Sequence, residues 1–251
     1  MRNIILLALS LFVVTLLFSQ ETDKPIGNKG FLIGVNANLI FPGADLSKRF
    51  GVAQSVAPYL GYKTSNNWTI GLTGGLLYGN NIKEDSLLKP LETLDGRLIG
   101  IDGFFSQVNL FERGYFVKAE LGKTFTLNTT NLNSGIMVNA GIGFLQHKIK
   151  IVDLDRLLPS LFGDYLKGYD RLSNGLLLSQ FIGYSYYGNS NFVNFYAGVE
   201  FMQGFTQNRR DYNYNQMRAD TEQRLDLMYT IRAGWIIPIF NTVGKSKKYY
   251  N

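Results

Sequence analysis

The chain contains a single histidine, His147, and no cysteine. This composition excludes disulfides, thiol catalysis and metal sites that need several histidines or thiolates. A serine activated by His147 would be the simplest nucleophilic arrangement, because it needs only a hydrogen-bonded base. Ser179 and Ser185 lie on the segment after that of His147, and the alternation places Ser185 near the opposite end. We therefore predict a structural role for His147 and keep catalysis as the alternative.

Charged side chains of both signs share the polar faces of three alternating segments. They are Lys118, Glu120, Glu200, Arg224, Asp226 and Arg232. Their neighbours on these faces are mostly Gly, Asn and Thr, which indicates a narrow interior rather than open water. Charges buried in such an interior need partners of opposite sign. We predict a paired lumen charge network that fills the interior, with a proton or ion path as the alternative.

Other chemical motifs are missing from the sequence. It has no phosphate-binding loop, acidic dyad, cluster of metal ligands or nucleic-acid-binding module. The formal net charge of +6 is spread along the chain, so it does not argue for nucleic acid. We expect no catalytic residue, no metal, no cofactor and no nucleic-acid partner.

The N-terminus has the features of a secretory signal peptide. Arg2 precedes an apolar run of 15 residues at 4–18, whereas a membrane-spanning helix needs about 20. We predict a signal peptide over residues 1–20, cleaved near Ser19 and Gln20, with an N-terminal membrane anchor as the alternative.

The rest of the chain alternates between apolar and polar residues with a period of two. In 224–240, for example, Leu225, Leu227 and Tyr229 oppose Asp226 and Thr230. A soluble sandwich would also alternate, but these segments reach about ten residues or more, the length that a tilted membrane strand needs. Aromatic residues gather at the segment ends, as in the two girdles of a membrane barrel. They are Trp68, Tyr78, Tyr115, Tyr184, Tyr186, Phe192, Trp235 and Phe240.

The alternation predicts an all-β fold, a closed antiparallel eight-stranded transmembrane β-barrel, with ten strands as the alternative. The predicted strands are 30–41, 53–63, 68–79, 115–126, 135–150, 175–187, 192–205 and 223–240. Residues 98–110 also alternate in part, but Asp102 and Gly103 form a tight-turn signal, which indicates a hairpin within a loop. Short turns are expected on the periplasmic side, at 64–67, 127–133 and 188–191. Long loops are expected on the outer side, at 42–52, 80–114, 151–174 and 206–222.

Two of the outer loops contain candidates for docking a partner. In loop three, apolar residues recur at helical spacing, and we predict a short helix there that caps the barrel or docks a partner. Loop four mixes arginine with tyrosine, which suits recognition of a protein or of lipopolysaccharide phosphates. The candidates are Leu157, Leu158, Leu161, Phe162, Tyr165, Arg209, Arg210, Tyr212, Tyr214 and Arg218. The domain prediction also includes a periplasmic segment at 21–29, the barrel at 30–240 and a basic periplasmic tail at 241–251.

The end of the last strand has the pattern of a barrel-assembly signal. Residues 232–239 read RAGWIIPI: polar, any, Gly, two of any, apolar, any, apolar. The signal peptide ends in a small residue before Gln20, similar to those of Bacteroidota. Over about residues 28–240, the chain resembles small outer-membrane β-barrels of Gram-negative bacteria, of the OmpX and PorT-like type. It departs from them in the tail after Phe240 and in Pro238, which removes a ladder donor.

This resemblance implies a non-enzymatic protein of the outer membrane. Eight strands leave no water-filled channel, so a general porin is disfavoured. We expect contacts with outer-membrane lipid and lipopolysaccharide, and protein partners in an accessory or scaffold role within a secretion or barrel-insertion assembly. The alternatives are a lipid-editing enzyme centred on His147 and a narrow transporter.

Overall fold

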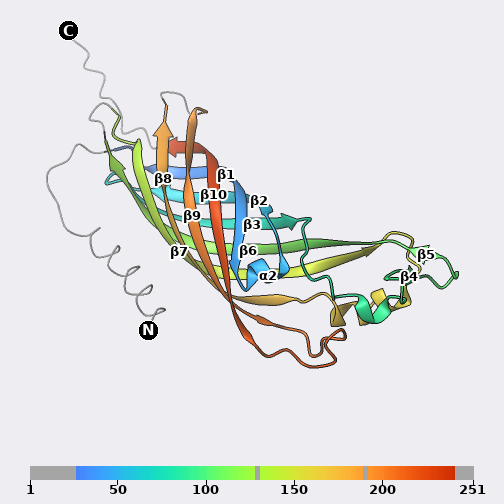
Figure 1. Cartoon of the computed structure of the whole chain (residues 1–251). Coiled ribbons are helices and arrows are strands. Elements are labelled where there is room, and N and C mark those ends of the chain that lie inside the picture. Colours follow the sequence, from blue (N-terminus) through green and yellow to red (C-terminus); the bar gives the residue numbers. More distant parts are fainter. Residues whose placement is uncertain (1–26, 128–130, 189–191, 241–251) are drawn as a thin grey trace, which may run out of the picture.

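The computed structural model describes residues 27–127, 131–188 and 192–240, and they form a closed antiparallel barrel (Figure 1). Its strands are β1 (Gly30–Ala44), β2 (Ala53–Lys63), β3 (Trp68–Gly79), β6 (Val108–Thr126), β7 (Gly135–Asp153), β8 (Ser173–Tyr187), β9 (Asn194–Asn208) and β10 (Gln223–Phe240). The order around the barrel is β1-β10-β9-β8-β7-β6-β3-β2, and pairing of β1 with β10 closes it. The prediction of eight strands is confirmed. The predicted signal peptide and basic tail lie outside the described residues.

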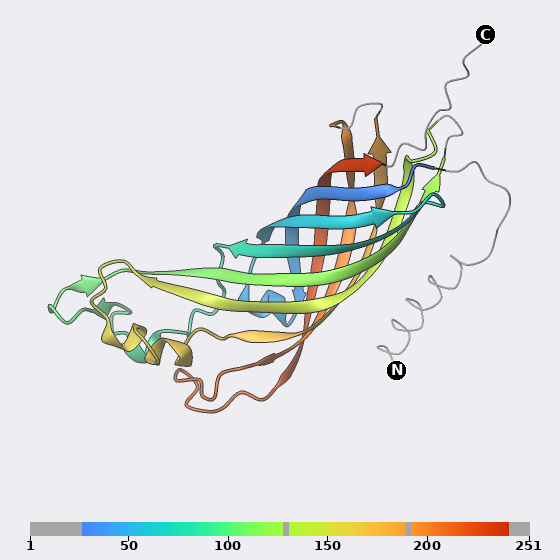
Figure 2. The same cartoon turned by 180° about the vertical axis from the view of Figure 1, so that it is seen from behind.

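The outer ends of several strands are longer than predicted. β6 begins at Val108, because residues 108–114 continue to pair with β7 as far as Asp153. Figure 2 shows β6 and β7 continuing past the end of β3 as a two-stranded ribbon. The outer connections are therefore loop one (45–52), loop two (80–107), loop three (154–172) and loop four (209–222).

Loop two contains the predicted hairpin. The strands β4 (Leu98–Ile99) and β5 (Phe105–Ser106) are paired, and a short 3-10 helix, η1 (Lys89–Leu91), precedes them. Gly103 adopts a φ of +82°, a conformation that costs a residue with a side chain 1–2 kcal/mol, as a rough figure. Asp102 Oδ1 accepts a hydrogen bond from the Phe104 N–H at 3.0 Å. The hairpin prediction is confirmed.

The single helix expected in loop three is replaced by two short 3-10 helices. They are η2 (Pro159–Leu161) and η3 (Tyr165–Gly168), and the only α-helix in the described residues is α2 (Leu46–Arg49) in loop one. Gly163 has a φ of +55° between the two turns, which breaks an α-helical run. Helical spacing therefore predicted helical turns in the right place but an uninterrupted helix that does not form.

The inward face forms two apolar clusters with a polar band between them. The larger cluster lies toward the outer end and includes Phe50, Leu145 and Met202, whereas the smaller one at the turn end includes Leu32 and Phe181. The outward face is also apolar. Within the described residues, no helix is long and apolar enough to cross a bilayer.

Candidate functional site

A buried charge network crosses the middle of the barrel lumen. It consists of Lys118, Glu120, Glu200 and Arg232, each at most 4% exposed. Arg232 Nη1 lies 2.7 Å from Glu120 Oε1 and 3.2 Å from Glu200 Oε1. Lys118 Nζ lies 3.0 Å from Glu120 Oε1 and also pairs with Glu200. Two cations and two carboxylates therefore neutralise one another in a space closed to water.

Neutral groups complete the coordination of these charges. The Thr73 hydroxyl donates to Glu120 Oε2 at 2.8 Å, and Arg232 Nε donates to the Tyr196 hydroxyl at 3.0 Å. The rings of Tyr196 and Phe181 lie 5.3 and 5.4 Å from the Arg232 guanidinium carbon. Gly234 makes room for Tyr196, because a Cβ there would lie 2.4 Å from the ring. The network fills the lumen at this level.

The structure brings four of the six predicted network residues together and places the other two elsewhere. Arg224 lies at the outer rim, where its Nη2 is 2.6 Å from Asp220 Oδ2. Asp226 lies in the lumen but contacts His147 and Thr206 instead of the network. The prediction that all six residues form one network is therefore wrong for Arg224 and Asp226. Residues on the same strand faces can lie at different heights along the barrel, and only those at the same height meet.

His147 forms a buried pair with Asp226. Its Nε2 lies 2.9 Å from Asp226 Oδ2, and its ring packs edge-on against Phe50. Nδ1 has no hydrogen-bond partner in the described part of the chain. The cross-strand neighbour, Ser173, instead donates its hydroxyl hydrogen to the Arg171 carbonyl. A serine–histidine nucleophile is therefore not assembled at His147.

The serines considered from the sequence lie away from this histidine. Ser179 pairs in register with Gly141, whereas His147 pairs with Ser173, six residues farther along each strand. Ser185 lies at the turn end, where its hydroxyl donates to the Gly135 carbonyl at 3.4 Å. No described group of three or more His, Asp or Glu side chains is arranged to hold a metal ion.

A second, partly buried ionic cluster ties the four outer loops together. In the middle, Glu84 of loop two lies 2.8 Å from Arg49 Nε of loop one and 3.0 Å from Arg171 Nε of loop three. Asp220 of loop four accepts one hydrogen bond from Arg224 and lies 3.7 Å from Arg49 Nη2. We call Arg49, Glu84, Arg171, Asp220 and Arg224 the loop latch. Its members come from four segments that are far apart in sequence, with Asp220 and Arg224 in the same one, so sequence analysis did not identify it.

The environment of Asp220 favours its charged form. Burial raises the pKa of this carboxyl, but the hydrogen bonds from Arg224 and Asn208, with the Arg224 charge, outweigh burial and hold the pKa below its ordinary value. Asp220 is therefore a carboxylate at neutral pH and can hold loop four to the latch.

A further buried site lies at the turn end of the barrel and was also missed. Lys63 Nζ is 2.9 Å from Asn133 Oδ1 and 3.1 Å from the Asn28 carbonyl, and its side chain is fully buried. The rings of Tyr187 and Phe240 lie 5.9 Å from the ammonium group. A lysine at the end of a strand usually lies in solvent. The only sequence signal for the buried position of Lys63 is the alternation along β2, which places its side chain on the inward face.

The predicted docking candidates divide into buried and exposed groups. Leu158 and Leu161 are buried in the outer cluster, whereas Leu157, Arg210 and Tyr214 are half-buried. Arg210 is held by Asp170, with Nε 2.8 Å from Oδ1. The candidates that remain exposed are Phe162, Tyr165, Arg209, Tyr212 and Arg218.

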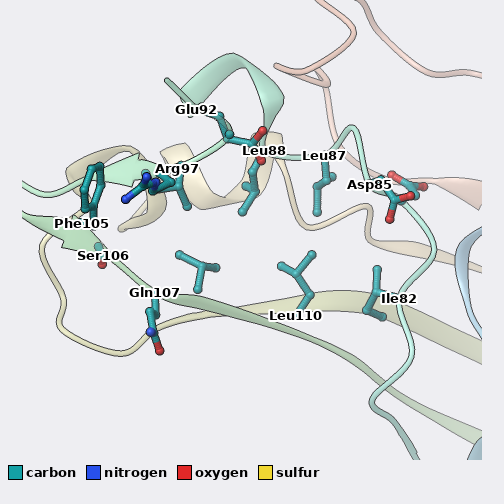
Figure 3. Close-up of a pocket in the computed structure, with 14 residues that line it drawn as sticks. Ile82, Asp85, Leu87, Leu88, Glu92, Arg97, Phe105, Ser106, Gln107 and Leu110 are labelled. Atoms are coloured by element: carbon teal, nitrogen blue, oxygen red, sulfur yellow. The ribbon is translucent and has the colours of Figure 1, made fainter. Parts of the chain in front are cut away.

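An open pocket of about 460 Å³ lies between loop two and the β6 ribbon. Figure 3 shows Leu87 and Leu88 pointing toward Leu110 of β6, with Asp85 and Glu92 at the edges. Within the described residues, Asp85 and Glu92 form no ion pair, in contrast to Glu84. The pocket therefore combines an apolar floor with carboxylates that are available to a partner.

Comparisons with known proteins match the chain only at the level of solved structures. No family model matches it, and no curated protein matches it. The attachment invasion locus protein Ail of Yersinia pestis aligns over 84% of this chain and 99% of its own, with 8% identity and a TM-score of 0.44. The N-terminal β-barrel domain of Pseudomonas aeruginosa OprF covers 84% and 98%, with 10% identity and a TM-score of 0.35. The outer membrane protein OprG of the same organism covers 86% and 99%, with 11% identity and a TM-score of 0.35.

Proposed function

We propose that this protein is a non-enzymatic outer-membrane β-barrel that acts as an accessory or scaffold subunit of an outer-membrane assembly, in secretion or barrel insertion. The proposal includes signal-peptide cleavage near Ser19 and Gln20, and the OmpX- and PorT-like, Bacteroidota-type character that the sequence suggests. The observation that carries it is the blocked lumen, because a barrel without an interior path must act through its outer surface.

The outward face of the strands supports insertion into a membrane. Large apolar side chains that are more than half exposed occur on strands all around the barrel. Examples are Phe31, Leu60, Ile70, Val117, Ile182, Val199 and Ile231. A soluble protein rarely exposes a continuous apolar surface of this extent, because water contact with it is unfavourable. In a membrane, the lipid hydrocarbon surrounds the strands, so this apolar surface no longer contacts water.

The outer loops support a docking role. The loop latch and the apolar packing of loop three hold these segments in one arrangement, so a partner would meet a preformed surface. We call the pocket of loop two, together with the exposed Phe162 and Tyr165 of loop three, the docking face. Its apolar floor and unpaired carboxylates suit a protein segment with apolar and basic side chains.

Membrane insertion is tested first and independently. Cell fractionation should place the protein in the outer membrane, and an unboiled sample should migrate differently from a boiled one on a gel. Recovery in the soluble periplasmic fraction would reject the barrel's proposed location.

The docking role is tested by site-specific photocrosslinking in living cells. A photoreactive residue at Phe105, in the pocket wall, or at Tyr165 should capture one discrete envelope protein. The matched control is Ile182, which faces the lipid and should capture no discrete protein. Introducing Asp85→Lys and Glu92→Lys should abolish the Phe105 product. The scaffold proposal fails if neither outer site yields a protein that the Ile182 control lacks.

A further inference from the structure

Three basic side chains form a row across the strands at the outer end of the barrel. Arg113 of β6 pairs in register with Lys148 of β7. Lys148 follows the last pair of the β7–β8 ladder and so lies level with Leu172, whose carbonyl accepts a hydrogen bond from the Arg209 N–H at 2.8 Å. We call Arg113, Lys148 and Arg209 the cationic row.

The cationic row faces away from the lumen. Tyr115 and Phe144 point outward and are exposed, and the period of two along a strand places Arg113 and Lys148 on the same face. The Arg113 guanidinium lies against the Tyr78 ring at 5.6 Å on that face. The row is therefore accessible to molecules that surround the barrel.

The row lies just beyond the apolar belt of the barrel. The last wholly apolar level on these strands is Val117, Phe144, Leu176 and Phe205, which are paired in register and exposed. The next level outward is Tyr115, Gln146, Asn174 and Gln207. The cationic row follows, about 13 Å along the strand from the apolar level, or about 10 Å along the membrane normal for a tilted strand. Along the strands, an apolar level is followed by a polar level and then by the cationic row. This order matches the hydrocarbon, interface and headgroup layers of a membrane leaflet.

The charges of the row are not neutralised by the chain. Within the described residues, none of the three forms an ion pair: Arg113 donates to the Gly79 and Glu112 carbonyls, and Arg209 donates to Asn174 Oδ1. Arg113 and Lys148 are also directly opposite one another, and such like-charged cross-strand pairs are destabilising. An anion bound between them would remove that repulsion.

We propose that the cationic row binds the phosphate groups of a phosphorylated glycolipid in the outer leaflet. Guanidinium groups match phosphate geometry by paired hydrogen bonds, and the lysine adds a point charge. A lipid satisfies the whole surface, because its acyl chains can cover Val117 and Phe144 while its phosphate reaches Lys148. The lipid site rests on the proposed membrane insertion but not on the docking role.

The test uses the mature protein in uncharged-detergent micelles, with diphosphorylated lipid A and the same lipid after enzymatic dephosphorylation as probes. Native mass spectrometry measures the affinity for each. The wild type should prefer the phosphorylated lipid. In the triple variant Arg113→Gln, Lys148→Gln, Arg209→Gln, the affinity for this lipid should fall about fivefold for each cation removed. The control triple, Lys89→Gln, Lys167→Gln, Arg218→Gln, removes three other exposed outer cations and should keep the wild-type affinity.

The single variant Lys148→Gln separates binding from folding. It relieves the like-charged pair, so the lipid-free barrel should be as stable as the wild type or more stable, while its preference for the phosphorylated lipid falls. Equal wild-type affinity for the two lipids, or equal losses in the row and control variants, would overturn the proposal. The gel-migration assay on the same samples shows separately whether the barrel is folded.

Discussion

The Arg232 guanidinium and the Glu120 carboxylate, 112 residues apart in the sequence, meet in the lumen through two hydrogen bonds. Nη1 lies 2.7 Å from Oε1, and Nη2 lies 3.2 Å from Oε2. Their strands, β10 and β6, are not neighbours in the barrel, so this pair links opposite walls.

Loss of the arginine from this pair should destabilise the barrel strongly. Arg232→Leu leaves Lys118 alone to balance two buried carboxylates, at a cost of about 3–5 kcal/mol. Urea unfolding in lipid vesicles, followed by tryptophan fluorescence, measures the free energy of unfolding. The control, Arg218→Leu, changes an exposed arginine whose side chain is 65% exposed and should have little effect. Equal stabilities of the two variants would mean that water reaches the network.

Replacement of His147 should affect stability and leave outer-membrane lipids unchanged. His147→Leu removes a hydrogen-bond partner of buried Asp226, at a cost of roughly 1–3 kcal/mol. Thr206→Val, which removes another partner of the same carboxylate, should have a similar effect on stability. Mass spectrometry of extracted lipids compares the strains. A lipid profile altered by His147→Leu but not by Thr206→Val would favour the lipid-editing alternative.

Neutralising the centre of the loop latch should release loop two without unfolding the barrel. Glu84→Gln removes the charge that Arg49 and Arg171 share, which leaves Arg171 without an ion pair and Arg49 with only its longer contact to Asp220. Trypsin should then cleave the intact, inserted protein at Lys83, Lys89 or Arg97 several times faster. Glu222→Gln, at a carboxylate that is 67% exposed, is the control and should leave cleavage unchanged. Identical digestion of both variants would show that apolar packing alone holds the loop.

Acid should release loop four. The pKa of Asp220 in the folded protein lies below its ordinary value, so the stabilisation is complete above the ordinary pKa and is lost as the pH falls through the folded one. Pepsin, which is active in acid, should cleave at Tyr212 or Met217 increasingly as the pH is lowered through this range. Asp220→Asn should be cleaved readily even at the upper end of the range, whereas Asp211→Asn should resemble the wild type. Cleavage of Asp220→Asn at the wild-type rate throughout would contradict this assignment.

Local patterns in the sequence determined the strands and their faces. Alternation with a period of two predicted eight strands, including β2, β3 and β10 at their observed bounds. The turn signal at Gly103 predicted the hairpin of loop two. The same parity placed Lys118 and Glu120 in the lumen. These features depend on residues close together in the chain, so their physical causes are present in the sequence itself.

The tertiary structure alone decided which side chains meet. Parity could not show that Arg232 would reach Glu120 while Asp226 reached His147, or that Arg224 would join Asp220 at the rim. Partners across a lumen depend on the stagger of strands that closure of the barrel imposes, and every strand contributes to that stagger. The loop latch depends in the same way on the positions of four separate loops. The period of two in the sequence determines which face of the sheet each residue lies on. Its position along the barrel axis is determined only when the barrel closes.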